Sequence, residues 1–177
     1  MNSDFLTQVT GIPSGFRFEE LFFNSPSKTI IAHCWEPTPD GNIGRIYLRP
    51  CGIEKYTQVQ NPGERVSFQS IVSVQTMPIA FSSTIQWSNK NGESGPVYQI
   101  ALETGLCVMM LEPKQLICPP PFDKIAIQKI ISGSEFPDLV CVGGFYQNNQ
   151  ITAYHLVRVD TTNGIVKMVD KLRAVFY

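Results

Sequence analysis

Two histidines, His33 and His155, are the residues of this chain best suited to acid–base chemistry, because imidazole is the usual general base. Cys34 follows His33 directly, and neighbours on a strand point to opposite faces, so these two alone cannot form a nucleophile–base pair. A Cys or Ser nucleophile, His33 as base and Glu36 or Asp40 as orienting acid would make a triad by role. No GxSxG motif selects such a serine. A half-buried structural histidine therefore explains His33 better.

His155 lies on the apolar side of an alternating segment, together with Ala153 and Val157, and we expect it to be a core imidazole. Two histidines without an acidic cluster do not favour a metal site, so we expect no metal and no cofactor. We do not expect an enzyme. The alternative that stays open is a Cys- or Ser-type hydrolase with His33 or His155 as its base.

The five cysteines are odd in number and widely spaced, with no CxxC pair that would suggest zinc. Most of them lie in or beside apolar runs, where a free thiol behaves as a small hydrophobe. We expect reduced, mostly buried thiols and a reducing compartment. Gly143-Gly144 lacks both phosphate-loop patterns, so we expect a bulge or a close backbone approach within a strand.

Aromatic residues near Asn-rich turns are the strongest candidates for binding. A flat apolar ring beside amide donors and acceptors suits sugars, and protein interfaces favour the same aromatics as anchors. Loops held by a rigid sheet are common places for function. The candidate binding residues are Trp35, Asp40, Asn42, Trp87, Asn89, Asn91, Tyr146, Asn148 and Asn149.

Composition limits the classes of partner. Charged residues make up 16% of the 177, against about 25% in ordinary soluble domains, and the net charge is −1. The Lys and Arg residues are scattered, which argues against nucleic acid as a partner. The longest apolar run, Gly105 to Leu111, is too short to span a membrane, and the first residues do not form a signal peptide. We expect a soluble protein of a reducing compartment or of a virion surface.

Turn signals divide the chain into short apolar segments, which predicts an all-β fold. Segments 66–74 and 151–159 alternate at period two, as half-buried strands do. We predict one domain over residues 1–177: an antiparallel two-sheet sandwich or jelly-roll-like barrel of about eight to ten strands, with at most one or two short helices. Further strand candidates are 28–35, 43–49, 79–87, 97–102, 106–111 and 139–146.

Two segments are ambiguous. Residues 123–131 follow three prolines and are interpreted as a short helix, although their isoleucines fit neither period well. Residues 165–176 have helical spacing, yet Asn163-Gly164 is also typical of a hairpin turn. We favour strand pairing at the start of that run and leave its end open. No internal repeat is visible.

These features favour a non-enzymatic surface-recognition or assembly module that acts through strand-end loops. It would be a viral capsid or projecting-domain type of protein, or a glycan- or receptor-binding domain. Its partner would be a protein, a glycan or further copies of the chain. Besides the hydrolase, a β-barrel that binds a small apolar ligand near Phe68, Met109 and Met110 is a second alternative.

Overall fold

The computed structural model describes residues 11–39, 41–88, 91–134 and 136–171, except for the side chains of residues 87, 88, 91, 92, 170 and 171. The described residues form three antiparallel sheets. The first sheet has the order β1 (Arg17–Asn24), β2 (Thr29–Thr38), β3 (Gly41–Pro50) and β4 (Thr57–Gln58). Each strand therefore pairs with the strand that follows it in the chain.

The second sheet has one additional hairpin. Its main order is β5 (Val66–Ser73), β6 (Ile79–Ser88), β8 (Val97–Ala101) and β9 (Cys107–Leu111). The short strand β7 (Asn91–Ser94) pairs with the last part of β6, whereas β8 pairs with the first part. The strand β6 therefore has a different partner along each half of its length.

The third sheet repeats the simple order of the first. It contains β10 (Lys124–Ser132), β11 (Asp138–Gln147), β12 (Gln150–Asp160) and β13 (Val166–Lys171). A single-turn 3₁₀ helix, η1 (Pro113–Gln115), lies in the connection from the second sheet. Within the described residues, no helix is long and apolar enough to cross a membrane.

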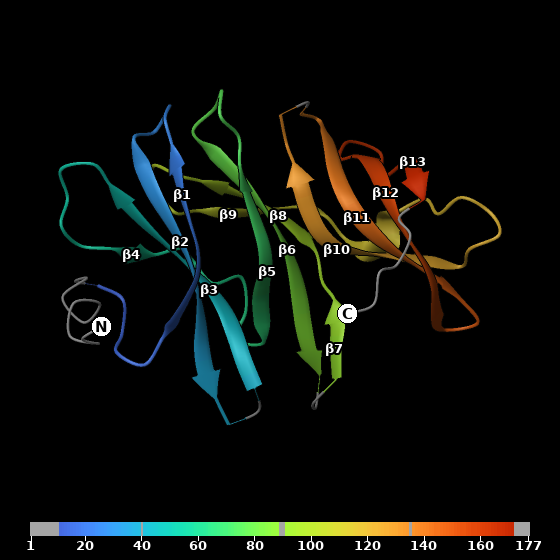
Figure 1. Ribbon diagram of the computed structural model, residues 1–177, viewed down its shortest axis with the longest axis horizontal. Coiled ribbons are helices and arrows are strands. Elements are labelled where there is room, and N and C mark those ends of the chain that lie inside the picture. Colours follow the sequence, from blue (N-terminus) through green and yellow to red (C-terminus); the bar gives the residue numbers. More distant parts are fainter. Residues whose placement is uncertain (1–10, 40, 89–90, 135, 172–177) are drawn as a thin grey trace.

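The three sheets lie side by side, with the second in the middle (Figure 1). The turns from β1 to β2, from β5 to β6 and from β10 to β11 all lie along the upper edge of that view. The ends of β2, β6 and β11 point to the lower edge. Corresponding hairpins therefore emerge on the same side of the molecule.

Two buried apolar clusters join the outer sheets to the middle sheet. One apolar cluster joins Ile31, Ile46 and Leu48 of the first sheet to Phe68 and Ile100 of the second. A second cluster joins the middle sheet to the third and includes Phe81, Ile125, Leu139, Phe145 and Val157.

A β-bulge interrupts the first strand of each sheet. In each case one residue is inserted relative to the partner strand, between Phe18 and Glu20, between Phe68 and Ser70, and between Ile127 and Lys129. The inserted residues are Glu19, Gln69 and Gln128. The surrounding segments 18–21, 68–71 and 127–130 share an apolar, Glu or Gln, polar, apolar pattern. The three bulges therefore share a short local pattern.

The all-β class is confirmed, and so are the strand candidates at 66–74 and 151–159. The described strands number thirteen, more than expected, and they form three sheets, none of which closes into a barrel. Residues 123–131 are not a helix, because β10 covers nearly all of them. The start of the 165–176 run pairs with β12 as predicted, and its last five residues, 172–176, lie outside the described ones.

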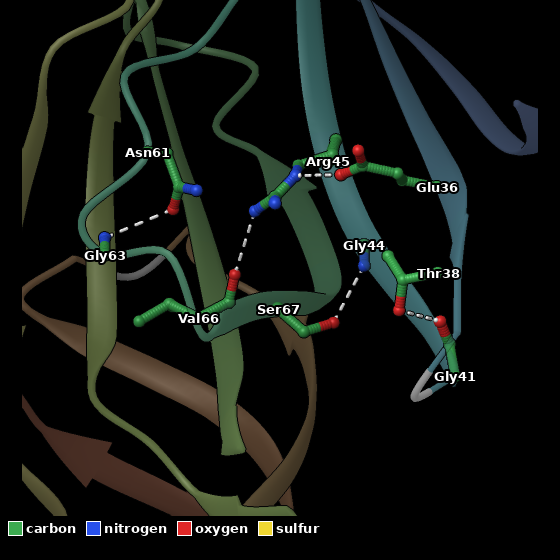
Figure 2. A network of polar contacts seen from close by, with 9 residues as sticks. All are labelled: Glu36, Thr38, Gly41, Gly44, Arg45, Asn61, Gly63, Val66 and Ser67. Atoms are coloured by element: carbon green, nitrogen blue, oxygen red, sulfur yellow. Dashed lines mark hydrogen bonds and ion pairs between the residues drawn. The ribbon is translucent and has the colours of Figure 1, made fainter. Parts of the chain in front are cut away.

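Polar contacts join the first sheet to the second (Figure 2). The Arg45 side chain donates to Glu36 Oε2 at 2.8 Å and to the carbonyl oxygen of Val66 at 3.1 Å. Beside it, the backbone N–H of Gly44 donates to Ser67 Oγ at 2.8 Å. The backbone of β3 therefore approaches that of β5 very closely.

Candidate functional site

A large hollow lies between β7, the segment around η1 and the start of β10, and we call it the β7–β10 hollow. Its volume is about 580 Å³. Its charged lining residues are Glu93, Glu112, Lys114, Asp123 and Lys124, and its apolar lining includes Pro96, Leu116 and Ile125. Three carboxylates and two ammonium groups thus surround one space, which suits a polar ligand without strong net charge.

Backbone contacts hold one wall of the β7–β10 hollow in place. The N–H of Gly95 donates to the Thr84 carbonyl oxygen at 2.8 Å, and Thr84 Oγ1 donates to the Pro96 carbonyl oxygen at 2.7 Å. A Cβ atom at Gly95 would lie 2.5 Å from Thr84 Oγ1. The link from β7 to β8 is therefore packed too tightly for a side chain at this position.

The charged groups of the hollow have specific neighbours. Lys114 Nζ lies 2.5 Å from Glu112 Oε2, and Lys124 Nζ lies 5.5 Å from the centre of the Tyr146 ring. Asp123 Oδ2 accepts the backbone N–H of Asn148 at 2.8 Å. This last bond ties the β11–β12 turn to the rim of the hollow.

Tyr146 belongs to the same region. Burial raises the pKa of its phenol, and the neighbouring Tyr154 and Glu93 raise it further. The Tyr146 hydroxyl therefore stays protonated at neutral pH and can donate a hydrogen bond. An aromatic ring with a donor, next to carboxylates and ammonium groups, is well suited to hold a hydroxyl-rich ligand.

Two of the predicted binding residues, Tyr146 and Asn148, do not line this hollow but contact its lining residues Lys124 and Asp123. Asn148 and Asn149 both have positive φ, at 54° and 62°, as a tight hairpin turn requires. The backbones of Trp87 and Asn91 belong to the paired strands β6 and β7, whose residues Gln86 and Glu93 line the hollow. The side chains of Trp87 and Asn91 lie outside the described ones, as do residues Asp40 and Asn89.

The first-sheet candidates lie elsewhere. Trp35 is inside β2 and not beside its loop, because β2 continues through Pro37 to Thr38. Its ring lies 5.1 Å from that of His33, and its Nε1–H donates to Glu19 Oε2 at 3.0 Å. Asn42 is exposed near the β2–β3 turn. The predicted residues therefore do not form one site.

A second hollow, of about 110 Å³, lies beside His33, and we call it the His33 hollow. His33 is fully buried, at 1% exposure, rather than half-buried as expected. Its Nε2 lies 3.0 Å from the Phe68 carbonyl oxygen, to which it donates. Its Nδ1 is buried and has no hydrogen-bond partner within the described part of the chain. The hollow is lined by Glu19, Glu20, His33, Gln69, Ser70, Gln128 and Lys129.

Sequence reasoning missed Gln69, Gln128 and Lys129 as candidates. The four-residue pattern around positions 19, 69 and 128 could have indicated these residues. It is difficult to see in the sequence because its three copies are unequally spaced and because two of them have Gln where the first has Glu. Ser70 of this hollow is already engaged, because its Oγ lies 2.7 Å from Ser83 Oγ and accepts the Ile130 N–H at 3.0 Å.

Three of the five cysteine thiols are not activated. Burial raises the pKa of Cys34 and Cys107 to about 11 and that of Cys141 to about 12, so these thiols stay protonated at neutral pH. All five cysteines are free, and Cys51 is exposed. His155 is buried against Phe145, as expected of a core residue. Among the described residues, no three His, Cys, Asp or Glu side chains form a metal-binding group.

Comparison with known proteins gives no family for the chain. No protein-family model matches the sequence, and no curated protein matches it significantly. Its function is therefore argued from the two hollows alone.

The burial of His33 makes a prediction about acid stability. Burial lowers the pKa of His33 below its usual 6.5, although the Phe68 carbonyl, Glu20 and Glu19 oppose this shift. The folded protein therefore binds this proton more weakly than the unfolded chain, and stability present above pH 6.5 falls as the pH drops below it. Lys129 is the cation that faces the same hollow.

Urea unfolding of the parent and of His33→Gln, between pH 7.5 and pH 5, measures this effect. We expect the parent to lose more stability than the variant over this range. Equal losses in the two proteins would contradict a neutral, buried His33.

Proposed function

We propose that this protein is a non-enzymatic recognition module that binds a neutral, hydroxyl-rich partner, such as a glycan on a receptor, in the β7–β10 hollow. One observation supports this most strongly. An open space of about 580 Å³ lies between β7, the segment around η1 and the start of β10, and its volume is in the range of ligand sites. Hairpin ends held by rigid sheets are suitable places for recognition.

The chemistry of the lining favours a neutral ligand over an ion. Lys114 and Glu112 already neutralise each other, and Lys124 lies beside the Tyr146 ring. The remaining groups include carboxylates of Glu93 and Asp123, which accept hydrogen bonds from hydroxyl groups. An aromatic face with surrounding acceptors and donors is the combination that sugar rings use.

The described residues provide little support for the hydrolase alternative. The buried thiols have raised pKa values, and Ser70, which lies in the hollow of His33, is already engaged by Ser83 and Ile130. The apolar-ligand alternative has equally little support. Phe68 lies in the core between the first two sheets, Met110 packs on the other core, and Met109 is exposed.

For the fold we propose a series of sandwich-like layers. Each outer sheet packs its apolar face on the middle sheet, and each sheet begins with a bulged strand. Side-by-side repetition of four-stranded sheets is the arrangement of blades in a β-propeller. Such repeated units place equivalent turns on one side, where the β7–β10 hollow also opens between two of them.

The test is a glycan screen followed by titration of the best binder. We expect Tyr146→Ala to weaken binding by about tenfold, since loss of an aromatic anchor typically costs more than 1 kcal/mol. Asp123→Asn keeps the acceptor for Asn148 and should weaken binding severalfold by removing charge. The control is Phe23→Ala, a more exposed aromatic on the first sheet, at 50% exposure against the half-buried Tyr146. No binder, or equal losses for Phe23 and Tyr146, would contradict the proposed site.

Light scattering distinguishes the assembly version of this function. A viral coat component would form a large closed particle that depends on concentration, whereas a receptor- or glycan-binding domain would stay small. A small species with glycan binding is the result we expect.

A further inference from the structure

The bulges of β1, β5 and β10 converge on one place, the His33 hollow. Each bulge contributes its inserted residue and the residue after it, so that pairs from three different sheets line the same space. Bulges redirect side chains and are common next to functional sites. Three bulges at equivalent positions, directed to one hollow, are difficult to explain by sheet packing alone. The pairs are Glu19 and Glu20, Gln69 and Ser70, and Gln128 and Lys129.

His33 shows which kind of ligand group fits there. Its Nε2–H is already used by the Phe68 carbonyl oxygen, so Nδ1 of the neutral ring carries only a lone pair. This atom is buried and unpartnered in the described structure, and a buried acceptor without a donor is costly. A ligand that completes the site must therefore donate a hydrogen bond to Nδ1.

The hydrogen-bond acceptors around the hollow favour a cation that carries N–H donors. Glu19 and Glu20 contribute two carboxylates and Lys129 one ammonium group, and Glu19 Oε2 already accepts from Trp35 and pairs with Arg17 at 3.4 Å. Glu20 pairs with His33 across β1 and β2 and shares its side of the sheet. Carboxylates, like the Nδ1 lone pair, can only accept hydrogen bonds at neutral pH. A positive group with several N–H donors matches these acceptors.

The size of the hollow limits the ligand to a small group. A volume of about 110 Å³ corresponds to roughly four water molecules at about 30 Å³ each. This is enough for an ammonium group with one or two carbons, but not for a guanidinium with its stem. Trp35 lies next to the hollow, where its ring packs on His33 and its indole N–H holds Glu19.

We propose that the His33 hollow binds a primary ammonium group, which donates to His33 Nδ1 and to the carboxylates of Glu20 and Glu19. The group would belong either to a small free amine or to a lysine side chain presented by another protein. This site is separate from the β7–β10 hollow and does not depend on the function proposed for it.

NMR titration of the folded protein with methylammonium chloride at constant ionic strength tests this site. We expect saturable shifts of the His33 ring nitrogens. Tetramethylammonium has the same charge but no N–H donor, and we expect it to leave Nδ1 unchanged. Saturable shifts of equal size with both ions would show only charge attraction and would overturn the proposal, as would no shift with methylammonium.

The sharpest test of the proposed ammonium site compares one substitution that removes a negative charge with one that removes a positive charge. Glu20→Gln should weaken methylammonium binding at least tenfold, whereas Lys129→Gln should strengthen it severalfold, because the competing cation is lost. A site for an anion would give the opposite signs. Glu103→Gln, at an exposed carboxylate outside this lining, is the matched control and should have no effect. His33→Gln removes the Nδ1 acceptor and should also weaken methylammonium binding. If His33→Gln does not fold, the result for Glu20→Gln still tests the proposal.

The source of the ammonium group is decided by a second titration. A peptide with one central lysine and blocked ends is compared with its arginine counterpart and with methylammonium. Tighter binding of the lysine peptide than of methylammonium indicates a protein partner. Binding of methylammonium alone indicates a free amine, and failure of both would overturn the proposal.

Discussion

Replacing Gly44 by alanine is expected to cost at least about 3 kcal/mol of folding free energy, a large fraction of the stability of such a domain. An added Cβ atom would lie 1.8 Å from the Phe68 carbonyl oxygen and 2.9 Å from His33 Nε2. Because the first contact is backbone, no side-chain rotation relieves it. The strand β3 would have to move away from β5, and the Gly44 bond to Ser67 would break.

Chemical unfolding followed by circular dichroism measures this loss. Gly63→Ala is the matched control, because a Cβ there meets only the Val66 side chain, at 3.3 Å, and the glycine has no positive φ. We expect that control to stay within about 1 kcal/mol of the parent. Similar losses in both variants would show that β3 and β5 are not closely packed.

Removing Glu36 from its ion pair with Arg45 is expected to destabilise the fold more than removing Arg45. The Arg45 side chain is 10% exposed and that of Glu36 is 33% exposed. Glu36→Gln would leave a buried guanidinium without its countercharge, with only neutral acceptors, and should cost about 2 to 3 kcal/mol. Arg45→Met would leave a carboxylate that water can reach and should cost less.

A double-mutant cycle of the two substitutions separates the pair from its surroundings. We expect the double variant to be more stable than Glu36→Gln alone, since removal of the guanidinium relieves the unpaired charge. The surface pair of Arg17 and Glu19, with side chains 72% and 43% exposed, is the control and should contribute little. If Arg45→Met loses more folding free energy than Glu36→Gln, this account of the interface is contradicted.

The strands were predictable where apolar residues alternate without interruption. Segment 66–74 was assigned correctly from its Val and Phe positions, whereas 123–131 was mistaken for a helix. The reason is the bulge at Gln128, which places Ile125 and Ile127 at odd positions and the next buried isoleucine, Ile130, at an even one. An inserted residue shifts the alternation by one position, so the pattern fits no single period.

The sites were predictable only in part. Tyr146 and Asn148 were chosen because an aromatic residue precedes an Asn-rich turn, and they contact Lys124 and Asp123 of the β7–β10 hollow, so their role in binding stays a prediction. Trp35 was misplaced because Pro37 was treated as the end of the strand, yet β2 continues past it. The His33 hollow combines residues far apart in the chain, and no local pattern around His33 indicates which partners the sheets bring to it.

The order of strands within the sheets also determines how the chain can fold. Nearly every pairing joins strands that are adjacent in the chain, so the contact order within each sheet is low for an all-β protein and hairpins can form rapidly. On one face of the first sheet, however, Ile46 and Leu48 are buried only through contact with the second sheet. Phe68 of the second sheet belongs to the same buried cluster. The smallest cooperative folding unit is therefore a pair of adjacent sheets, and the middle sheet belongs to both such pairs.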